Sequence, residues 1–153
     1  MDKTNALRIL DQAKINYKYK EYDSSVTNGS DIVNLLQENC DQVFKTLVTI
    51  SNTKEYFVYI IPVDESLDLK KCAKIANVKN ISMIKQKELL PLTGYIHGGC
   101  SPIGMNKKFK TFLNDTAILF DTIFVSGGRV GLQIEIDTKD LIKLLDIKVG
   151  DLI

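Results

Sequence analysis

Two consecutive β-rich runs constrain the fold of this chain more than any other feature of its sequence. FKTLVTIS (residues 44–51) and EYFVYIIP (residues 55–62) are rich in β-branched and aromatic residues, and residues 52–54 between them form a turn sequence, Asn-Thr-Lys. We therefore predict a β-hairpin that Pro62 ends, because proline cannot donate to a strand ladder. A hairpin is antiparallel, so a sheet that contains it cannot be purely parallel.

The other elements are predicted from the spacing of apolar residues. Helices are expected over residues 4–14, 31–39, 66–76, 85–92 and 137–146. Further strands are expected over residues 16–22, 81–84, 110–113, 121–126 and 131–136. Ser30 or Asp31 is the expected N-cap of the second helix, and Pro91 the expected end of the fourth. This interleaving predicts an α/β domain with a mixed sheet flanked by helices.

The charge balance argues against strong, unaided binding to nucleic acid. Twenty basic residues against nineteen acidic ones give a net charge of +1, and only residues 107–110 (KKFK) form a basic run. A protein that grips a nucleic-acid backbone needs many phosphate contacts from lysine and arginine. If the protein acts on nucleic acid, we expect it to bind weakly or to use a partner.

The cysteines and the hydropathy pattern predict the setting of the protein. Cys40, Cys72 and Cys100 are odd in number and widely spaced, which fits neither a disulfide framework nor a zinc motif. The chain begins with charged residues, and no run is long and apolar enough for a membrane span. We expect a cytoplasmic protein of one domain, without a signal peptide, membrane contact, metal or cofactor.

A glycine-rich stretch, GYIHGGCSPIG (residues 94–104), contains the only histidine, His97. It lacks the Lys-Ser/Thr ending of a P-loop, the spacing of a dinucleotide fingerprint and the final glycine of a nucleophile elbow. A catalytic triad would have to use His97, which is more typical of a surface loop. Backbone N–H groups here, and in Ser126-Gly127-Gly128, could face a carbonyl or an oxyanion. The alternative is that both stretches are only tight turns.

Lys45 is unusual because it lies inside the apolar run of the first hairpin strand. Alternation places it on one face with Val43 and Leu47. One interpretation is that this face meets solvent, or that the lysine stem covers apolar surface while its ammonium reaches water. The other is that the ammonium lies in a pocket and holds a phosphate, a carbonyl or a developing oxyanion. The residues alone leave both open.

Four segments in order carry a family resemblance: FKTLV, LDLKKCAKIA, GYIHGGCSPIG and VSGGRVGLQIEI. Together they resemble the YbaK/EbsC family of aminoacyl-tRNA deacylases, which is related to the editing domain of bacterial prolyl-tRNA synthetases. The resemblance runs from the first predicted helix to about Asp151. It implies a single compact editing domain over residues 1–153, with a mixed, barrel-like sheet flanked by helices.

The resemblance also implies a set of site residues. The signature lysine of the family falls on Lys45, which would hold the phosphate of the terminal adenosine and help orient the ester. The implied catalytic residues are Lys45, Gly98, Gly99 and Ser126. The implied substrate-binding residues are Tyr22, Thr46, Gly127 and Gly128. Gln133 and His97 depart from the family pattern, in which an acidic and an apolar residue, respectively, are commoner; the loop TNGS before the second helix also lacks an aromatic residue.

The implied activity is trans-editing of mischarged tRNA, chiefly Cys-tRNA(Pro). In this branch the thiol of the substrate attacks its own ester and leaves as a cyclic thioester, so none of the three cysteines is needed. The expected partners are the 3′ aminoacyl end of tRNA and prolyl-tRNA synthetase, and the protein is expected to be a monomer. Two alternatives remain: a deacylase for Ala-tRNA(Pro) that positions a water, and a non-catalytic module that binds tRNA or a synthetase.

Overall fold

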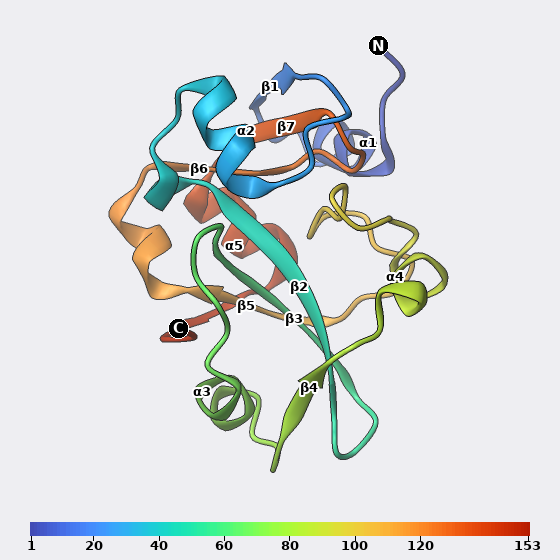
Figure 1. The fold of residues 1–153 in the computed structure, drawn as a ribbon, viewed down its shortest axis with the longest axis vertical. Coiled ribbons are helices and arrows are strands. Elements are labelled where there is room, and N and C mark those ends of the chain that lie inside the picture. The colour runs from blue at the N-terminus through green and yellow to red at the C-terminus, as the bar shows by residue number, and fades with distance from the viewer.

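The strands divide into two sheets (Figure 1) in a computed structural model that describes all 153 residues. The larger sheet has the order β4-β2-β3-β5-β8 and comprises β2 (Phe44–Ser51), β3 (Tyr56–Pro62), β4 (Ile81–Met83), β5 (Lys110–Asn114) and β8 (Lys148–Gly150). The smaller sheet has the order β1-β7-β6 and comprises β1 (Tyr17–Glu21), β6 (Thr122–Ser126) and β7 (Leu132–Asp137).

The predicted hairpin and the mixed sheet are confirmed. Strand β2 pairs with β3 antiparallel, with Val48 opposite Val58, and the chain turns over residues 52–55. Strand β3 pairs with β5, and β5 with β8, in parallel. The strands do not close into one barrel, since the two sheets are joined only by an isolated bridge between Val43 and Phe124. We call the line where these sheets meet the seam.

Five short helices cover the sheets (Figure 1). They are α1 (Asn5–Gln12), α2 (Gly29–Leu36), α3 (Leu69–Ile75), α4 (Gln86–Thr93) and α5 (Thr138–Leu145). Short 3₁₀ turns cover Cys40–Gln42 and Asp115–Leu119. Thr4, Asn28, Asp68 and Asp137 cap four of the helices by accepting backbone N–H groups. None of the helices has the length and apolar character that a membrane crossing requires.

Two helix boundaries differ from the prediction. The N-cap of α2 is Asn28 rather than Ser30 or Asp31, because the Asn28 Oδ1 accepts from the N–H groups of both later residues, at 2.9 Å and 3.4 Å. Helix α4 continues through Pro91 to Thr93. Its last turn is stabilised without the proline N–H, because the Thr93 hydroxyl and the N–H of Gly94 donate to carbonyls one turn earlier, each at 2.8 Å.

The main core lies between the two sheets, and a second core lies on the opposite side of the larger sheet. The main core joins α1 and α5 to side chains from both sheets, including Phe44 and Ile60 of the larger sheet and Ile134 of the smaller one. The second core packs Tyr59 and Phe112 against α3. Because both faces of β3 are covered, its run of apolar residues does not need to alternate with polar ones.

Candidate functional site

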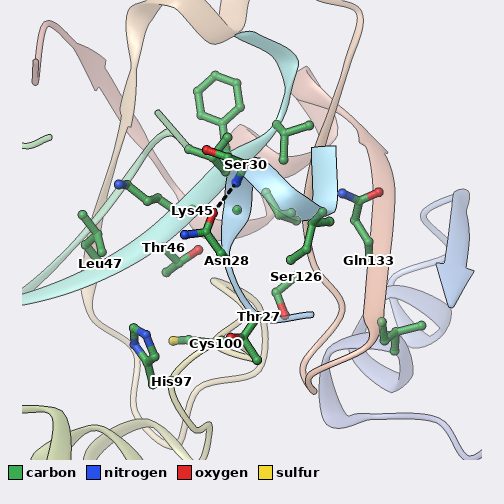
Figure 2. A pocket seen from close by; sticks show the side chains of 18 of the residues that line it. Thr27, Asn28, Ser30, Lys45, Thr46, Leu47, His97, Cys100, Ser126 and Gln133 are labelled. Carbon is green, nitrogen blue, oxygen red and sulfur yellow. Dashed lines mark hydrogen bonds between the residues drawn. The ribbon is translucent and has the colours of Figure 1, made fainter. Parts of the chain in front are cut away.

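A cavity of about 660 Å³ lies along the seam, and its walls come from five separate parts of the chain. These are the segment from Tyr22 to the first turn of α2, the start of β2, residues 63–64 after β3, the α4–glycine-loop region, and the β6–β7 turn with its flanking strand ends. Figure 2 shows side chains from these parts around the cavity. Of the predicted site residues, Lys45, Thr46, Gly98, Ser126 and Tyr22 line it, and Gly99, Gly127 and Gly128 do not.

Lys45 reaches the cavity because the first half of β2 has a free edge. Strand β2 pairs with β4 only from Thr49 to Ser51, so its earlier residues have a sheet neighbour on one side only. All of residues 43–47 therefore line the cavity, and the expected alternation of faces does not separate them. The Lys45 side chain is half-buried and makes no hydrogen bond or ion pair within the chain. Thr46 adds a buried hydroxyl that also has no partner.

Asp64 gives this side of the cavity a carboxylate. It accepts hydrogen bonds from Cys40 and, at 3.0 Å, from the Ser30 hydroxyl. These two bonds, with a smaller effect from the charge of Lys45, lower the pKa of Asp64. The same Cys40 contact raises the pKa of that thiol to about 11, so Cys40 is protonated at neutral pH.

The N-terminus of α2 lies on the same side of the cavity as Lys45. Asn28, Gly29 and Ser30, at the start of this helix, all line the cavity. A Cβ on Gly29 would lie 3.1 Å from the Val63 Cβ, so the helix start is packed tightly against the end of β3. The partial positive charge of a helix N-terminus adds to the charge of Lys45. Lys45 and the helix start therefore favour an anion here, against the opposing negative charge of Asp64.

The glycine loop contributes backbone donors through Gly98 and Cys100. Both residues line the cavity, and neither backbone N–H donates to an acceptor within the chain. Gly98 has φ +86°, a conformation that favours glycine. Gly99 instead donates its N–H to the Ile96 carbonyl at 3.0 Å, which closes a turn. The free N–H donors of this loop thus include those of Gly98 and Cys100, but not that of Gly99.

The Ser126-Gly127-Gly128 turn differs from the expectation of free N–H donors. Gly127 donates to the Leu132 carbonyl at 2.9 Å, and Gly128 donates to the Ser126 hydroxyl at 3.2 Å. These two glycines shape the turn, because a Cβ on Gly127 would lie 2.6 Å from Leu132 Cγ and Gly128 has φ +106°. Ser126 is the residue of this turn that reaches the cavity.

The remaining titratable groups fit a site without a protein nucleophile. Burial raises the pKa of the Cys100 thiol to about 12, which keeps it protonated. Burial also raises the pKa of Tyr22, with a smaller effect from Glu38. His97 is exposed where it lines the cavity (Figure 2). No group of three or more His, Cys, Asp or Glu side chains is placed to hold a metal ion.

Several lining residues were not predicted from the sequence. Asn28 and Asp64 were not singled out, although the TNGS loop already contained the capping asparagine as a signal. Gln133 was noted only as a departure from a family pattern, yet it is buried in the cavity wall and bonded to Glu38. No local sequence pattern connects those two residues, because they meet only when α2 packs beside β7.

Comparisons with known proteins agree with this architecture. The family model for the aminoacyl-tRNA editing domain matches residues 24–144. A protein of Enterococcus faecalis, provisionally named Cys-tRNA(Pro)/Cys-tRNA(Cys) deacylase EbsC, is 42% identical over 144 residues, which cover 93% of this chain and 88% of that protein.

Two solved structures share the fold. One is provisionally described as a trans-editing enzyme for prolyl-tRNA synthetase; it has a TM-score of 0.85 and 20% identity, and covers 99% of this chain and 98% of its own. The other, a hypothetical protein, has a TM-score of 0.90 and 17% identity, and covers 97% of this chain and 99% of its own. With the family model and the close relative, the assignment is clear: the chain is an enzyme that belongs to the aminoacyl-tRNA editing domain family.

Proposed function

We propose that this enzyme removes the wrong amino acid from mischarged tRNA and that Cys-tRNA(Pro) is its main substrate. The observation that carries the proposal is one cavity that combines the unpaired ammonium of Lys45 with the free N–H groups of Gly98 and Cys100. The name of the E. faecalis relative supports the choice of substrate. The editing domain is proposed to span residues 1–153, since β1 and β8, outside the matched range, pair with β7 and β5.

In the proposed reaction the substrate supplies the nucleophile. Lys45 and the N-terminus of α2 hold the phosphate of the terminal adenosine, which places the ester beside the glycine loop. The cysteine sulfur of the substrate bonds to its own carbonyl carbon, and the N–H groups of Gly98 and Cys100 stabilise the oxyanion. The bond to the ribose oxygen then breaks, the thiol proton ends on the ribose hydroxyl, and a cyclic thioester leaves.

Ser126 and Tyr22 are proposed to bind the aminoacyl end, and Thr46 to contact the substrate through its unpaired hydroxyl. Gly99, Gly127 and Gly128 are proposed to act by shaping the two turns beside the cavity. Because the net charge is only +1, we propose that prolyl-tRNA synthetase supplies most of the grip on the tRNA.

The function is tested by measuring ester loss from cysteinyl-, alanyl- and seryl-tRNA(Pro), with and without prolyl-tRNA synthetase. We expect rapid loss of the cysteinyl ester with release of a cyclic thioester, because a hydroxyl is a much poorer nucleophile than a thiol. Equal loss of the alanyl ester would replace the thiol route with attack by a positioned water. Loss of none of the esters would leave a module that binds tRNA without acting on it.

A further inference from the structure

Two adjacent residues at the start of the first helix hold the two turns that flank the cavity. The Thr4 hydroxyl donates to the Gly127 carbonyl at 2.5 Å, in the β6–β7 turn. Asn5 Nδ2 donates to the Gly104 carbonyl at 2.8 Å, at the end of the glycine loop. In Figure 1 the chain passes from its N-terminus into α1 beside this turn and this loop. We call this pair of residues the N-terminal clasp.

The clasp is anchored to the main core through α1. Ala6, Leu7 and Leu10 of this helix are fully buried in that core. The Thr4 hydroxyl also accepts from the Leu7 N–H at 3.3 Å, so it caps the helix while it holds the turn. The donor of this hydroxyl and one of its acceptor sites are therefore both in use.

The clasp provides the hydrogen-bonded link between the two turns. No hydrogen bond joins the turns directly, although Gly99 lies against the backbone of the β6–β7 turn. The clasp is packed tightly against both, because a Cβ on Gly128 would lie 3.1 Å from the Thr4 Cβ, and one on Gly104 would lie 3.0 Å from Asn5 Nδ2. The clasp and the two turns thus form one contiguous unit.

Neither residue of the clasp lines the cavity, so its effect on the reaction is indirect. The β6–β7 turn carries Ser126, and the glycine loop carries the free N–H groups of Gly98 and Cys100. Groups on two separate turns can act on one ester only if the turns keep a fixed placement. An error of ~1 Å in such a placement can lower a rate by ~100-fold.

We infer that Thr4 and Asn5 are positioning residues, which set the placement of the glycine loop relative to the β6–β7 turn. The inference rests on the proposed function, because that function assigns groups on both turns to one reacting ester. Lys45 and the start of α2 belong to other elements and make no hydrogen bond to the clasp. Loss of the clasp should therefore affect the chemical step rather than the binding of the tRNA phosphate.

The test combines steady-state kinetics with amide hydrogen exchange. Thr4→Val removes the hydroxyl but keeps the shape of the side chain, so kcat for cysteinyl-tRNA(Pro) should fall by ~10-fold with KM within ~2-fold. The Gly127 amide, which closes the β6–β7 turn, should exchange ~5-fold faster, as expected for one lost hydrogen bond. The Gly99 amide, on the other turn, should exchange at least ~2-fold faster. Thr4→Ser keeps the hydroxyl and should restore each quantity to within ~2-fold of the wild type.

Asn5→Asp separates positioning from stability. A carboxylate cannot donate to the Gly104 carbonyl, yet a negative charge in the first turn of α1 favours the helix. This variant should therefore keep its midpoint of unfolding close to that of the wild type, while kcat falls by ~3-fold or more. If Thr4→Val folds poorly, Asn5→Asp decides the question.

Thr138→Val is the matched control. Thr138 stands at the start of α5, and its hydroxyl donates to the Phe120 carbonyl at 2.8 Å, outside the cavity. Its variant loses the same kind of hydrogen bond as Thr4→Val. It should nevertheless keep the wild-type kcat and the wild-type exchange of the Gly99 amide.

The outcomes separate this inference from the proposed function. A wild-type kcat in Thr4→Val, or an equal loss of kcat in Thr138→Val, would overturn the role of the clasp. A loss of kcat that Thr4→Ser restores and Thr138→Val does not show would support it. If the wild type deacylated no ester, the proposed function would fail and exchange would decide: a faster Gly99 amide in Thr4→Val would support the clasp, and an unchanged one would overturn it.

Discussion

Replacing Gly99 by alanine should push the glycine loop away from the β6–β7 turn. A Cβ on Gly99 would lie 2.7 Å from the Val130 nitrogen and 2.8 Å and 2.9 Å from two backbone atoms of Arg129, closer than real Cβ atoms are found. These neighbours are backbone atoms, so they cannot move aside as the end of a side chain can. The φ angle of Gly99 is not positive, and the contact alone is therefore responsible for the effect.

The size of the effect follows from these distances. To bring the closest contact to the 3.4 Å at which ordinary van der Waals contact begins, the two segments must separate by about 0.7 Å. Overpacking of this kind costs about 1–3 kcal/mol of the free energy of unfolding. Misplacing a catalytic group by ~1 Å can lower a rate by ~100-fold, so we expect deacylation by Gly99→Ala to fall by ~10- to 100-fold.

Two measurements check this prediction. Denaturant unfolding gives the loss of stability, and the initial rate of cysteinyl-tRNA(Pro) deacylation gives the loss of activity. Gly150→Ala is the control, because its Cβ would meet the end of a flexible side chain, Ile75 Cδ1, outside the cavity. Its rate should be that of the wild type. Wild-type stability and activity in Gly99→Ala would refute the tight packing described above.

Three further predictions follow from single groups. Lys45→Ala should lower deacylation by ~100-fold or more, yet change the free energy of unfolding by less than about 0.5 kcal/mol, because the ammonium has no hydrogen-bond or ion-pair partner in the chain. The control Lys87→Ala, on the exposed side of α4, should change neither quantity. An active Lys45→Ala variant would show that this lysine is not part of the site. Cys100→Ala should deacylate at a rate within a few-fold of the wild type, because a pKa of about 12 leaves only about one thiolate in 10⁵ at pH 7. Loss of activity in a folded variant would show that the thiol takes part in the reaction. Burial raises the pKa of Cys72 and Cys100 from 9.0 to about 12, so as pH rises the unfolded state loses these thiol protons before the folded state does. The free energy of unfolding should therefore fall as pH rises from about 9 to about 12. Denaturation at several pH values measures this fall, which should be smaller in a variant with alanine at both positions.

Local patterns in the sequence were enough for most elements of the fold. The β-rich runs 44–51 and 55–62 gave the central hairpin, and the apolar spacing of α1 and α5 gave two helices that pack on the main core. The strand β8 (Lys148–Gly150) was missed, because only Val149 in it is a typical strand residue, whereas the equally short β4 begins with an apolar isoleucine and was expected. The division into two sheets was also out of reach, since it depends on pairing between strands far apart in sequence, such as β1 with β7.

The sequence indicated those residues of the candidate site that stand out by themselves. It did not indicate those whose position depends on contacts with residues far away in the sequence. Lys45 was singled out because a lysine is unusual inside an apolar strand, and Ser126 because the family resemblance implied it; the structure brings both to one cavity. Which glycine N–H groups remain free depends on how each turn closes, and sequence does not contain that geometry. The hydrogen bond from Gln133 to Glu38 forms only after α2 is packed, so no local pattern indicates it.

The order in which the walls of the cavity are synthesised determines when the binding site can form during translation. Strand β1, near the start of the chain, has β7 as its only sheet partner, and β7 also provides one wall of the cavity. A nascent chain is made from its N-terminus, so the segment around β1 emerges long before the strand that completes its sheet. The binding site is therefore formed only when almost the whole chain has left the ribosome, and partial translation products should not bind aminoacyl-tRNA.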